Sequence, residues 1–268
     1  AVFSSNTSQK AYEEDVLLAG FGAAPTKNEG ASVSYDDAGQ QWTARYQHET
    51  VALAFSITEE AEEDGQYGSI ASRYTKALAR SMSSTKEIKA ANVLNNATSA
   101  NGGDGTTLLS TSHPTQNGNQ SNTLATAADL SETSLESILI QIADMKDERG
   151  LRVAAQGTQL IIPTAYTFVA ERLLESQLRT GTADNDINAI KSGGYLPKGY
   201  HVMRRLTDAD QFFVQTDVPD GLKYFTRSAM RKGMEGDFET GNIRYKCRER
   251  YSFGFTDWRG IFGSEGAA

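Results

Sequence analysis

The chain has 268 residues, of which 38% are hydrophobic, so it can bury the core of one large domain or of two modest ones. Acidic residues number 34 against 26 Lys and Arg, and the net charge of −8 argues against a dedicated nucleic-acid-binding protein, because phosphate contacts need a basic face. The only cysteine, Cys247, excludes an intrachain disulfide and a cysteine zinc cluster, and it favours assembly inside a cell. No apolar run is long enough to span a bilayer and no signal peptide is visible at Ala1, so we expect no membrane partner.

Residues 1–30 are predicted to form an arm. They mix Ser, Asn, Thr and Gly with one short amphipathic piece, 12–18, and they lack the apolar density to fold alone, so the arm should pack on something else. The stretch GFG at 20–22 begins like a dinucleotide-binding loop, but Pro25 stands where that fingerprint needs a glycine. We interpret this stretch as a hinge within the arm and expect no cofactor.

Residues 31–58 are predicted to form a long β-hairpin. Alternation of polar and apolar residues over 32–35 leads to a turn signal at 36–39, and alternation resumes over 42–57 with a change of phase that indicates a bulge or twist. A two-stranded ribbon is marginal alone in water, so we expect this hairpin to lie across a neighbouring subunit. The alternative is an ordinary hairpin on the sheet of its own domain. The residues that we place at the subunit contact are Asp37, Gly39, Gln41 and Trp42.

One long helix is predicted over 67–98, because apolar residues recur along it at three- and four-residue steps. The acidic run at 59–64 has no apolar frame around it, so we interpret it as a solvated face and not as a pair of catalytic carboxylates. Arg73 and Arg80 lie on a neighbouring face of the helix, where we expect them to pair with the acidic run or with another chain. Contact of these two residues with phosphates is the alternative.

Residues 99–129 are rich in Gly, Asn, Ser and Thr and are predicted to form a loop. His113 within it has no His, Cys or carboxylate at metal-ligand spacing, and His48 and His201 are equally isolated. We therefore expect no metal site. Spacing alone does not exclude a catalytic triad, but no nucleophile motif supports one.

A helix over 131–149 is the best-defined element of the sequence. Ser131 can cap its N-terminus, Leu130 and Leu135 can pack together beside the cap, and Gly150 stands where a glycine often follows a helix. The apolar stripe that we expect to be buried consists of Leu135, Ile138, Leu139, Ile142 and Met145.

A buried strand ending at 160–162 and a helix over 166–174 follow, separated by Pro163, which cannot continue a strand ladder. The helix leads into a polar segment, 180–188, with few apolar anchors. A strand and helix that carry a long polar loop are typical of a rigid platform that presents the loop for contact. The residues that we place at this contact are Thr182, Asp184, Asn185 and Asp186.

The C-terminal part is predicted to be β. Three short strands lie at 200–204, 212–215 and 222–225. A long hairpin over 234–255 is predicted to turn at Thr240-Gly241, and a two-residue turn would place Asp237 opposite Arg244.

Two more basic residues, Arg248 and Arg250, share the face of Arg244 by the period-two rule of a strand, but they find no acid on the partner strand. We expect them to pair with a neighbouring subunit or with another part of the fold. Cys247 points to the opposite, apolar face, where a small buried hydrophobe is a better interpretation than a nucleophile.

Several stretches, taken in order, carry a family resemblance. They are WTARYQHETVALAFSITEEAEEDGQYG at 42–68, TKEIKAANVLNNAT at 85–98, GTTLLSTSHP at 105–114, DLSETSLE at 129–136, KDERG at 146–150, LIIPTAYTFVAERLLES at 160–176, NDIN at 185–188 and DFETGNIRYKCRERYSFGFTDWRG at 237–260. Together the sequence resembles the major capsid proteins of tailed bacteriophages, close to the Mu-type major head subunit. The resemblance covers nearly the whole chain and is weakest in the first thirty or so residues.

The resemblance implies an α+β protein with the Hong Kong 97-type capsid fold and no enzymatic activity. On that template the arm is 1–30, the extended E-loop hairpin is 31–58, the peripheral domain with its long spine helix is 59–128 and 229–268, and the axial domain is 129–228.

The resemblance also implies a function, which is self-assembly through hexamers and pentamers into an icosahedral shell around phage double-stranded DNA. Assembly would take place in the host cytoplasm, with portal, scaffold and decoration proteins as further partners. Because the subunit is acidic, we expect it to contact packaged DNA only weakly. Two other classes stay open from the residues, namely a β-rich surface binding or adhesion module, and a hydrolase whose pocket joins His113 or His201 to carboxylates.

Overall fold

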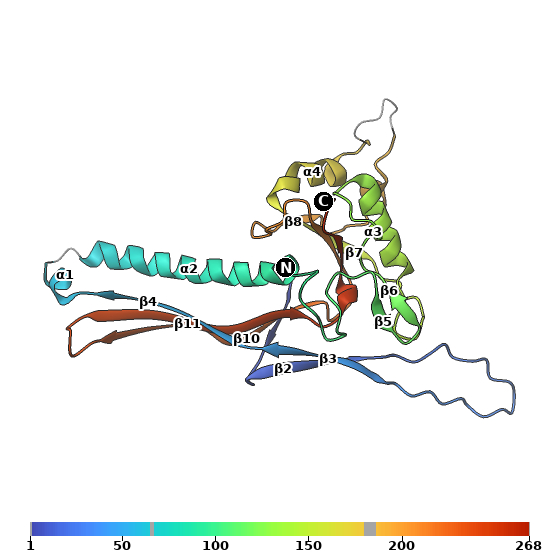
Figure 1. Ribbon diagram of the computed structural model, residues 1–268, viewed down its shortest axis with the longest axis horizontal. Coiled ribbons are helices and arrows are strands. Elements are labelled where there is room, and N and C mark those ends of the chain that lie inside the picture. The colour runs from blue at the N-terminus through green and yellow to red at the C-terminus, as the bar shows by residue number, and fades with distance from the viewer. Residues whose placement is uncertain (1, 65–66, 180–185, 268) are drawn as a thin grey trace.

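The computed structural model describes residues 2–64, 67–179 and 186–267. It is an elongated body in which the long helix α2 (Tyr67–Asn95) runs along a sheet, and a second unit of strands and shorter helices stands at one end (Figure 1). A thin ribbon leaves the body below that end (Figure 1). The predicted α+β class is confirmed, because helices and mostly antiparallel sheets form separate layers.

The elements follow one another in a mixed order. The strands are β1 (Ser4–Thr7), β2 (Tyr12–Leu18), β3 (Gln40–Gln47), β4 (Glu49–Ile57), β5 (His113–Thr115), β6 (Gly118–Gln120), β7 (Gly157–Ile162), β8 (Tyr200–Val202), β9 (Phe212–Thr216), β10 (Leu222–Gly236), β11 (Ile243–Phe255) and β12 (Ile261–Ser264). Besides α2, the helices are α1 (Glu59–Glu63), α3 (Glu132–Asp144), α4 (Thr167–Glu175) and α5 (Ala189–Gly193), with 3-10 turns η1 (Thr164–Tyr166) and η2 (Trp258–Gly260).

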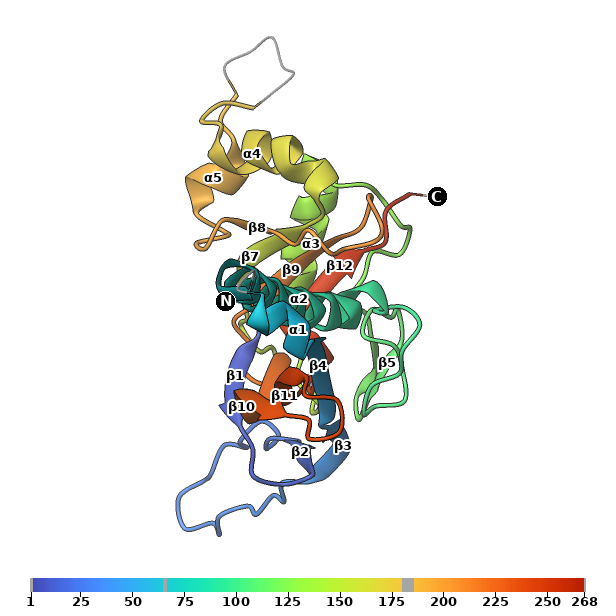
Figure 2. The ribbon, with the colours of Figure 1, turned by 90° about the vertical axis from the view of Figure 1, so that its left-hand side faces the viewer.

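The long sheet has the strand order β1-β10-β11-β4. β10 and β11 are antiparallel neighbours, β4 pairs with β11, and β1 adds a short parallel edge to β10. Side chains alternate between the two faces, and the apolar set, including Val51, Phe55 and the buried Cys247, packs against Leu78 and Met82 of α2. Helix α2 therefore covers one face of the long sheet (Figure 2). The opposite face, the open face, carries no helix of the described chain, and Tyr46 of β3 packs on it at Phe225.

The second sheet has the strand order β12-β9-β7-β8. β7 ends at Ile162 and Pro163 stops it, as predicted. Leu135 of α3 and Ala170 of α4 pack with this sheet in the main core, which also receives Leu94 from the end of α2. The two units of the molecule therefore share one continuous core.

The ribbon differs from the predicted hairpin. The partner of β3 is β2, which lies in the predicted arm, and no strand forms over 32–35. Residues 19–39 join the two strands without regular secondary structure and turn back at 28–31, so the turn predicted at 36–39 is wrong. A four-residue alternation is too short to specify a strand, and its partner comes from a segment that the sequence assigns to another part of the molecule.

The hairpin of β10 and β11 is confirmed, but its predicted register is wrong by two residues. Residues 237–242 form a wider connection than the predicted two-residue turn. The amide of Asp237 donates to the carbonyl of Asn242 (2.8 Å), and its carboxylate accepts from the hydroxyl of Thr240 (2.8 Å) and pairs with Arg244. These bonds stabilise the wider loop. A shift of two residues leaves every side chain on its predicted face.

Both long helices are confirmed with shorter C-terminal ends. α2 ends at Asn95, three residues before the predicted end, and α3 ends at Asp144. The predicted role of Gly150 as the residue after α3 is wrong, because Met145 already adopts an extended conformation. Gly150, at φ 87°, instead closes a separate turn that follows the helix.

The predicted N-terminal cap of α3 is confirmed, and it gives a first testable prediction. The Ser131 hydroxyl accepts from the amide of Ser134 (3.2 Å), while the Ser134 hydroxyl accepts from the amide of Ser131 (2.9 Å). Ser131→Ala removes one half of this capping box, and we expect a loss of about 1 kcal/mol in the free energy of unfolding. Urea unfolding followed by circular dichroism measures it, and an unchanged midpoint would show that the cap does not stabilise the protein.

Candidate assembly interface

The bend between β3 and β4 falls at His48, which is buried at the root of the ribbon. Its Nδ1 lies 3.0 Å from the hydroxyl of Ser252 on β11, and its Nε2 lies 2.9 Å from the hydroxyl of Ser8, next to β1. Ser8 in turn donates to Glu13 on β2 (2.7 Å). The predicted break over 42–57 is thus confirmed, and His48, isolated in the sequence, joins the ribbon to the long sheet.

The buried side chain of Lys223 also joins the base of the ribbon to the long sheet. The ammonium group of Lys223 on β10 lies 2.5 Å from Asp15 of β2 and 2.6 Å from Asp220. Burial disfavours the charged form of Lys223, but the hydrogen bonds to the two carboxylates outweigh burial and raise its pKa. The hydroxyl of Thr256 donates to Asp15 (3.0 Å) and contacts the hydroxyl of Tyr46 on β3 (2.5 Å). Both ribbon strands are therefore held in a fixed orientation to the body.

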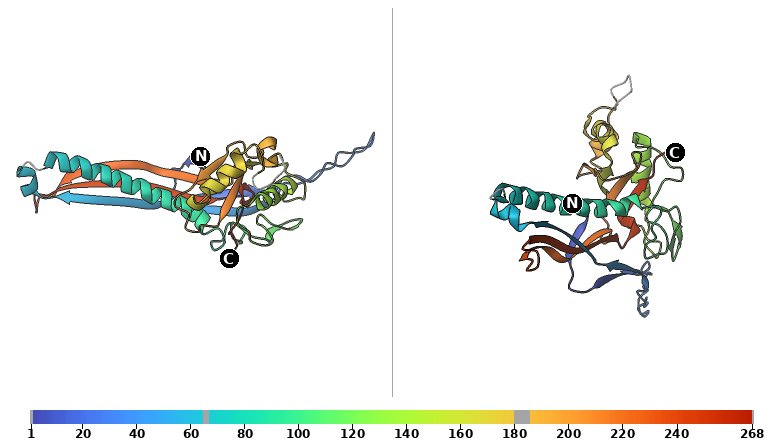
Figure 3. Two further views of the ribbon diagram at one scale, coloured as in Figure 1. Left: turned by 90° about the horizontal axis from the view of Figure 1, so that it is seen from above. Right: turned by 60° about the vertical axis from the view of Figure 1, so that its left-hand side comes forward.

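Beyond this root, residues 19–39 continue the line of the ribbon past the body (Figure 3). The base of this loop is pinned, because Asp36 accepts from the amide of Gly22 (2.8 Å) and pairs with Arg149 (2.5 Å). The rest of the loop leaves three large apolar side chains in solvent. These are Phe21 at 60%, Val33 at 62% and Tyr35 at 95% exposure.

The hairpin residues predicted at a subunit contact lie near the base of this loop and not at its tip. Asp37 is exposed, and Gly39 and Gln41 are half-buried. Trp42 is an internal anchor, because it packs against the main core and its Nε1 donates to the carbonyl of Thr256 (3.1 Å). The exposed apolar side chains of the loop, which the turn prediction obscured, fit a contact better than Trp42 does.

The other predicted contact residues are scattered over the body. Arg73 and Arg80 are exposed on α2, and neither has an ion-pair partner within the part of the chain that the structure describes. Asp186 is exposed in the second unit. Three further residues of that predicted contact, Thr182, Asp184 and Asn185, lie outside the described residues.

Arg248 and Arg250 project from the open face of the long sheet, away from α2. Arg231 on β10 lies directly opposite Arg248, so like charges face each other across the two strands. Arg248 and Arg250 were predicted to pair either with another part of the fold or with a neighbouring subunit. Among the described residues neither has an acidic partner within the chain. Pairing with a neighbouring subunit stays a prediction.

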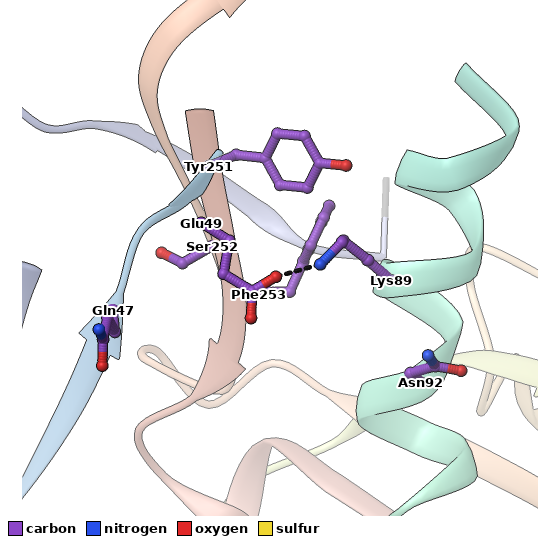
Figure 4. Close-up of a pocket in the computed structure, with 7 residues that line it drawn as sticks. All are labelled: Gln47, Glu49, Lys89, Asn92, Tyr251, Ser252 and Phe253. Atoms are coloured by element: carbon purple, nitrogen blue, oxygen red, sulfur yellow. Dashed lines mark hydrogen bonds and ion pairs between the residues drawn. The ribbon is translucent and has the colours of Figure 1, made fainter. Parts of the chain in front are cut away.

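A pocket of about 220 Å³ opens between α2 and the long sheet, and Lys89 of α2 pairs with Glu49 of β4 beside it (Figure 4). The only hydroxyl nucleophile on a small side chain there, Ser252, is engaged with His48. The pocket is therefore a polar gap in the packing between α2 and the long sheet, and its residues do not form a catalytic arrangement. In the described ranges no three His, Cys, Asp or Glu side chains gather to hold a metal ion, and no helix there is long and apolar enough to cross a membrane.

A buried polar network around His113 is absent from the sequence prediction. Nδ1 of His113 lies 2.7 Å from the carboxylate of Asp104, Nε2 donates to Oδ1 of Asn122 (3.1 Å), and the ring stacks on Trp258 at 4.2 Å. Metal-ligand spacing in the sequence does not reveal this network, because Asp104, nine residues before His113, contacts the imidazole ring across a loop. Because His113 is fully buried and both of its nitrogens are engaged, a hydrolase pocket at this residue has no access for a substrate.

The pKa of Asp104 gives a second testable prediction. Burial opposes its ionisation, but hydrogen bonds from His113 and Thr106 outweigh burial and hold the pKa below its usual value. The folded state is therefore stabilised above the unfolded pKa of about 3.9, and that stabilisation is lost as the pH falls through the folded pKa. Asp104→Asn should destabilise the protein more at pH 7 than at pH 3, as measured by urea unfolding at both values. If Asp104→Asn lowers the free energy of unfolding equally at pH 7 and pH 3, the lowered pKa of Asp104 in the folded state is contradicted.

Solved structures with the same architecture identify the fold of the protein. The chain is similar to the capsid of the native GTA particle, with a TM-score of 0.62 and 13% identity over 100% of this chain and 89% of that one. It is similar to the capsid of Myoviridae phage XM1 at a TM-score of 0.59 and 9% identity, over 99% of this chain and 90% of that one. A third match is the bacteriophage JBD30 capsid decorated with minor capsid protein trimers, at 0.58 and 13%, over 76% and 89%.

These neighbours have the Hong Kong 97-type capsid fold, as the sequence resemblance implies. A family model described as phage capsid protein matches residues 40–263, so the chain belongs to the phage capsid protein family. It is a major capsid protein, a structural subunit of the phage shell and not an enzyme. No curated protein matches the sequence.

Proposed function

We propose that copies of this chain assemble into closed rings and then into an icosahedral shell, and that the loop 19–39 forms a main contact with a neighbouring copy. The observation that carries the proposal is the exposure of Val33 and Tyr35 on a segment that extends beyond its own body. Contiguous exposed apolar groups mark surfaces that bind a partner. A projecting segment that binds a different site on the next copy is a heterologous contact, and such contacts close into rings.

A receptor of matching chemistry supports this contact. An apolar groove of about 350 Å³ runs between β4 and α2, and Leu53 and Tyr74 on its walls are about half exposed. Phe55 in the groove contacts Tyr74 edge to face at 5.8 Å. The groove exposes mainly apolar surface, which suits side chains such as Val33 and Tyr35 of a second copy.

We assign the peripheral domain to 59–128 and 229–268 and the axial domain to 129–228. We place the boundary between arm and ribbon before β2, in place of residue 30, because β2 pairs with β3. Contacts in the axial domain would include Asp186. Kinship with the Mu-type head subunit rests on the sequence stretches alone.

Further partners follow from the class of protein. Minor capsid protein trimers decorate the JBD30 capsid, and we propose that decoration, portal and scaffold proteins bind shells of this chain assembled in the host cytoplasm. The charge of −8 favours weak contact with packaged DNA. Tight binding of dissociated subunits to duplex DNA at physiological salt would contradict that last proposal.

Negative-stain electron microscopy of the purified full chain tests the proposed function. We expect shells, rings or tubes. A preparation that holds only small uniform monomers, at every concentration and salt tried, would argue against self-assembly and would reopen the adhesion-module interpretation.

A further inference from the structure

The open face of the long sheet carries a basic face, which consists of Arg227, Arg231, Lys246, Arg248 and Arg250. Its members come from β10 and β11, and the ladder places Arg231 against Arg248 and Ser228 against Arg250. Arg231, Lys246 and Arg248 are exposed. Facing like charges destabilise a ladder, so an anionic partner is the simplest way to offset this arrangement.

No carboxylate of the described chain pairs with this basic face. The Nε atoms of Arg227 and Arg250 are also buried without a hydrogen-bond partner among the described residues. Burial lowers the pKa of His48 beside them, and the charges of Arg250 and Arg227 lower it further against the opposing effect of Glu13, which locates a positive field at this point of the sheet.

The surroundings of the basic face leave room for a docking element. On β4 the neighbours across the ladder are small and exposed, namely Thr50, Ala52, Ala54 and Ser56. Side chains of this size do not shield the guanidinium groups from a partner. The open face is thus broad and basic, and only small side chains line its β4 edge.

The same chain carries one dense acidic segment, residues 59–64, at the end of the body farthest from the second unit (Figure 1). Glu59, Glu60, Glu63 and Asp64 are exposed, and none has an ion-pair partner among the described residues. The acids of the ribbon and its loop, residues 12–47, are less dense, and four of the six are already paired within the chain. The pairs are Glu13 with Lys10, Glu14 with Arg45, Asp15 with Lys223, and Asp36 with Arg149.

We propose that the basic face binds the acidic segment of a second copy of this chain. The inference rests on the proposed self-assembly and names the partner of one of its surfaces. Because α1 lies at one end of the body and the basic face lies on the side of the sheet, the contact is heterologous, and repetition of it propagates from copy to copy. Complementary charge at this contact fixes which copy binds where.

Charge reversal and rescue test the proposal. The variants are Arg231→Glu with Arg248→Glu, Glu60→Lys with Glu63→Lys, and all four changes together. Each pair of reversals should lower the yield of sedimenting particles by at least about tenfold, because like charges then meet at the contact. The variant with all four substitutions should restore the yield to within about threefold of wild type. Lys232→Glu is the matched control, because Lys232 is next to Arg231 but faces the side of Cys247.

Several results would overturn the proposal. One is normal assembly of the Arg231→Glu and Arg248→Glu variant. Another is a variant with all four substitutions that has a wild-type urea midpoint, and is therefore folded, but does not assemble. A third concerns the Arg231→Glu and Arg248→Glu variant. If it forms normal shells but its dissociated subunits no longer bind a duplex oligonucleotide that wild-type subunits bind, the basic face is a DNA contact. If the reversals impair folding, Arg231→Gln with Arg248→Gln tests the same contact more gently. Absence of particles from the wild type would refute the proposed function itself.

Discussion

Replacement of Arg259 by Met should destabilise the subunit by roughly 3–5 kcal/mol, the cost typical of breaking a buried ion pair from one side. The Arg259 side chain is 4% exposed and lies between two buried acids, 2.6 Å from Glu148 and 3.4 Å from Asp257. Its Nε donates to the carbonyl of Lys146 (3.0 Å), and its guanidinium lies 4.4 Å from the Trp258 ring. Methionine fills much of the volume but leaves both carboxylates without a cation.

Urea unfolding of dissociated subunits, followed by tryptophan fluorescence, measures this effect. Arg152→Met is the matched control, because Arg152 pairs with Asp144 in a solvent-exposed bridge that should contribute less than about 1 kcal/mol. Arg259→Lys should fall between, since lysine keeps the charge but loses the planar fork. A loss below about 1 kcal/mol for Arg259→Met would show that the network does not stabilise the fold.

Shortening the loop should have the largest effect on assembly. Residues 23–35 can be replaced by a short Gly-Ser turn, because the amide of Gly22 already lies 2.8 Å from Asp36. The removed segment contains Val33 and Tyr35, which are exposed, so the urea midpoint of the subunit should not change. The particle yield should fall by at least about tenfold if the loop is a main contact between copies.

A milder pair of substitutions, Val33→Ser with Tyr35→Ser, tests the same contact without shortening the chain. Sedimentation and negative-stain microscopy report the yield for both variants. Normal particles from both would show that the loop is dispensable for assembly. A lowered urea midpoint would instead mean that the loop stabilises its own subunit.

The long helices were predictable because their signal is local. The three- and four-residue periodicity of α2 and the Ser131 cap of α3 act within a few residues, and nothing distant competes with them. The strand–proline–helix order around Pro163 was predictable for the same reason. The resemblance of ordered stretches then supplied the fold class, which no single stretch specifies.

Pairings between distant segments were not predictable. β3 pairs with β2 across a long loop, and the four residues at 32–35 offered a nearer but incorrect partner. The register of β10 against β11 depends on hydrogen bonds of the Asp237 side chain, which a turn rule does not include.

The buried networks escaped sequence analysis for a similar reason. Asp104 and His113 share a loop, but Trp258 stacks on His113 from the other end of the chain, and Arg259 beside it pairs with Glu148. Their charges are compatible with burial only because the folded chain supplies each partner, so composition and periodicity do not reveal them. The packing of Trp42 against the main core is likewise non-local and was not predicted, while its contact role stays a prediction.

Hydrogen exchange read by mass spectrometry tests most directly whether the extended loop is covered by a sister copy. Residues 19–39 have no regular secondary structure, so their amides should exchange within seconds in dissociated subunits. In assembled particles we expect the same amides to exchange at least about 100-fold more slowly, with α3 as an internal reference that changes little. Equal, fast exchange of the loop in subunits and in particles would contradict the account.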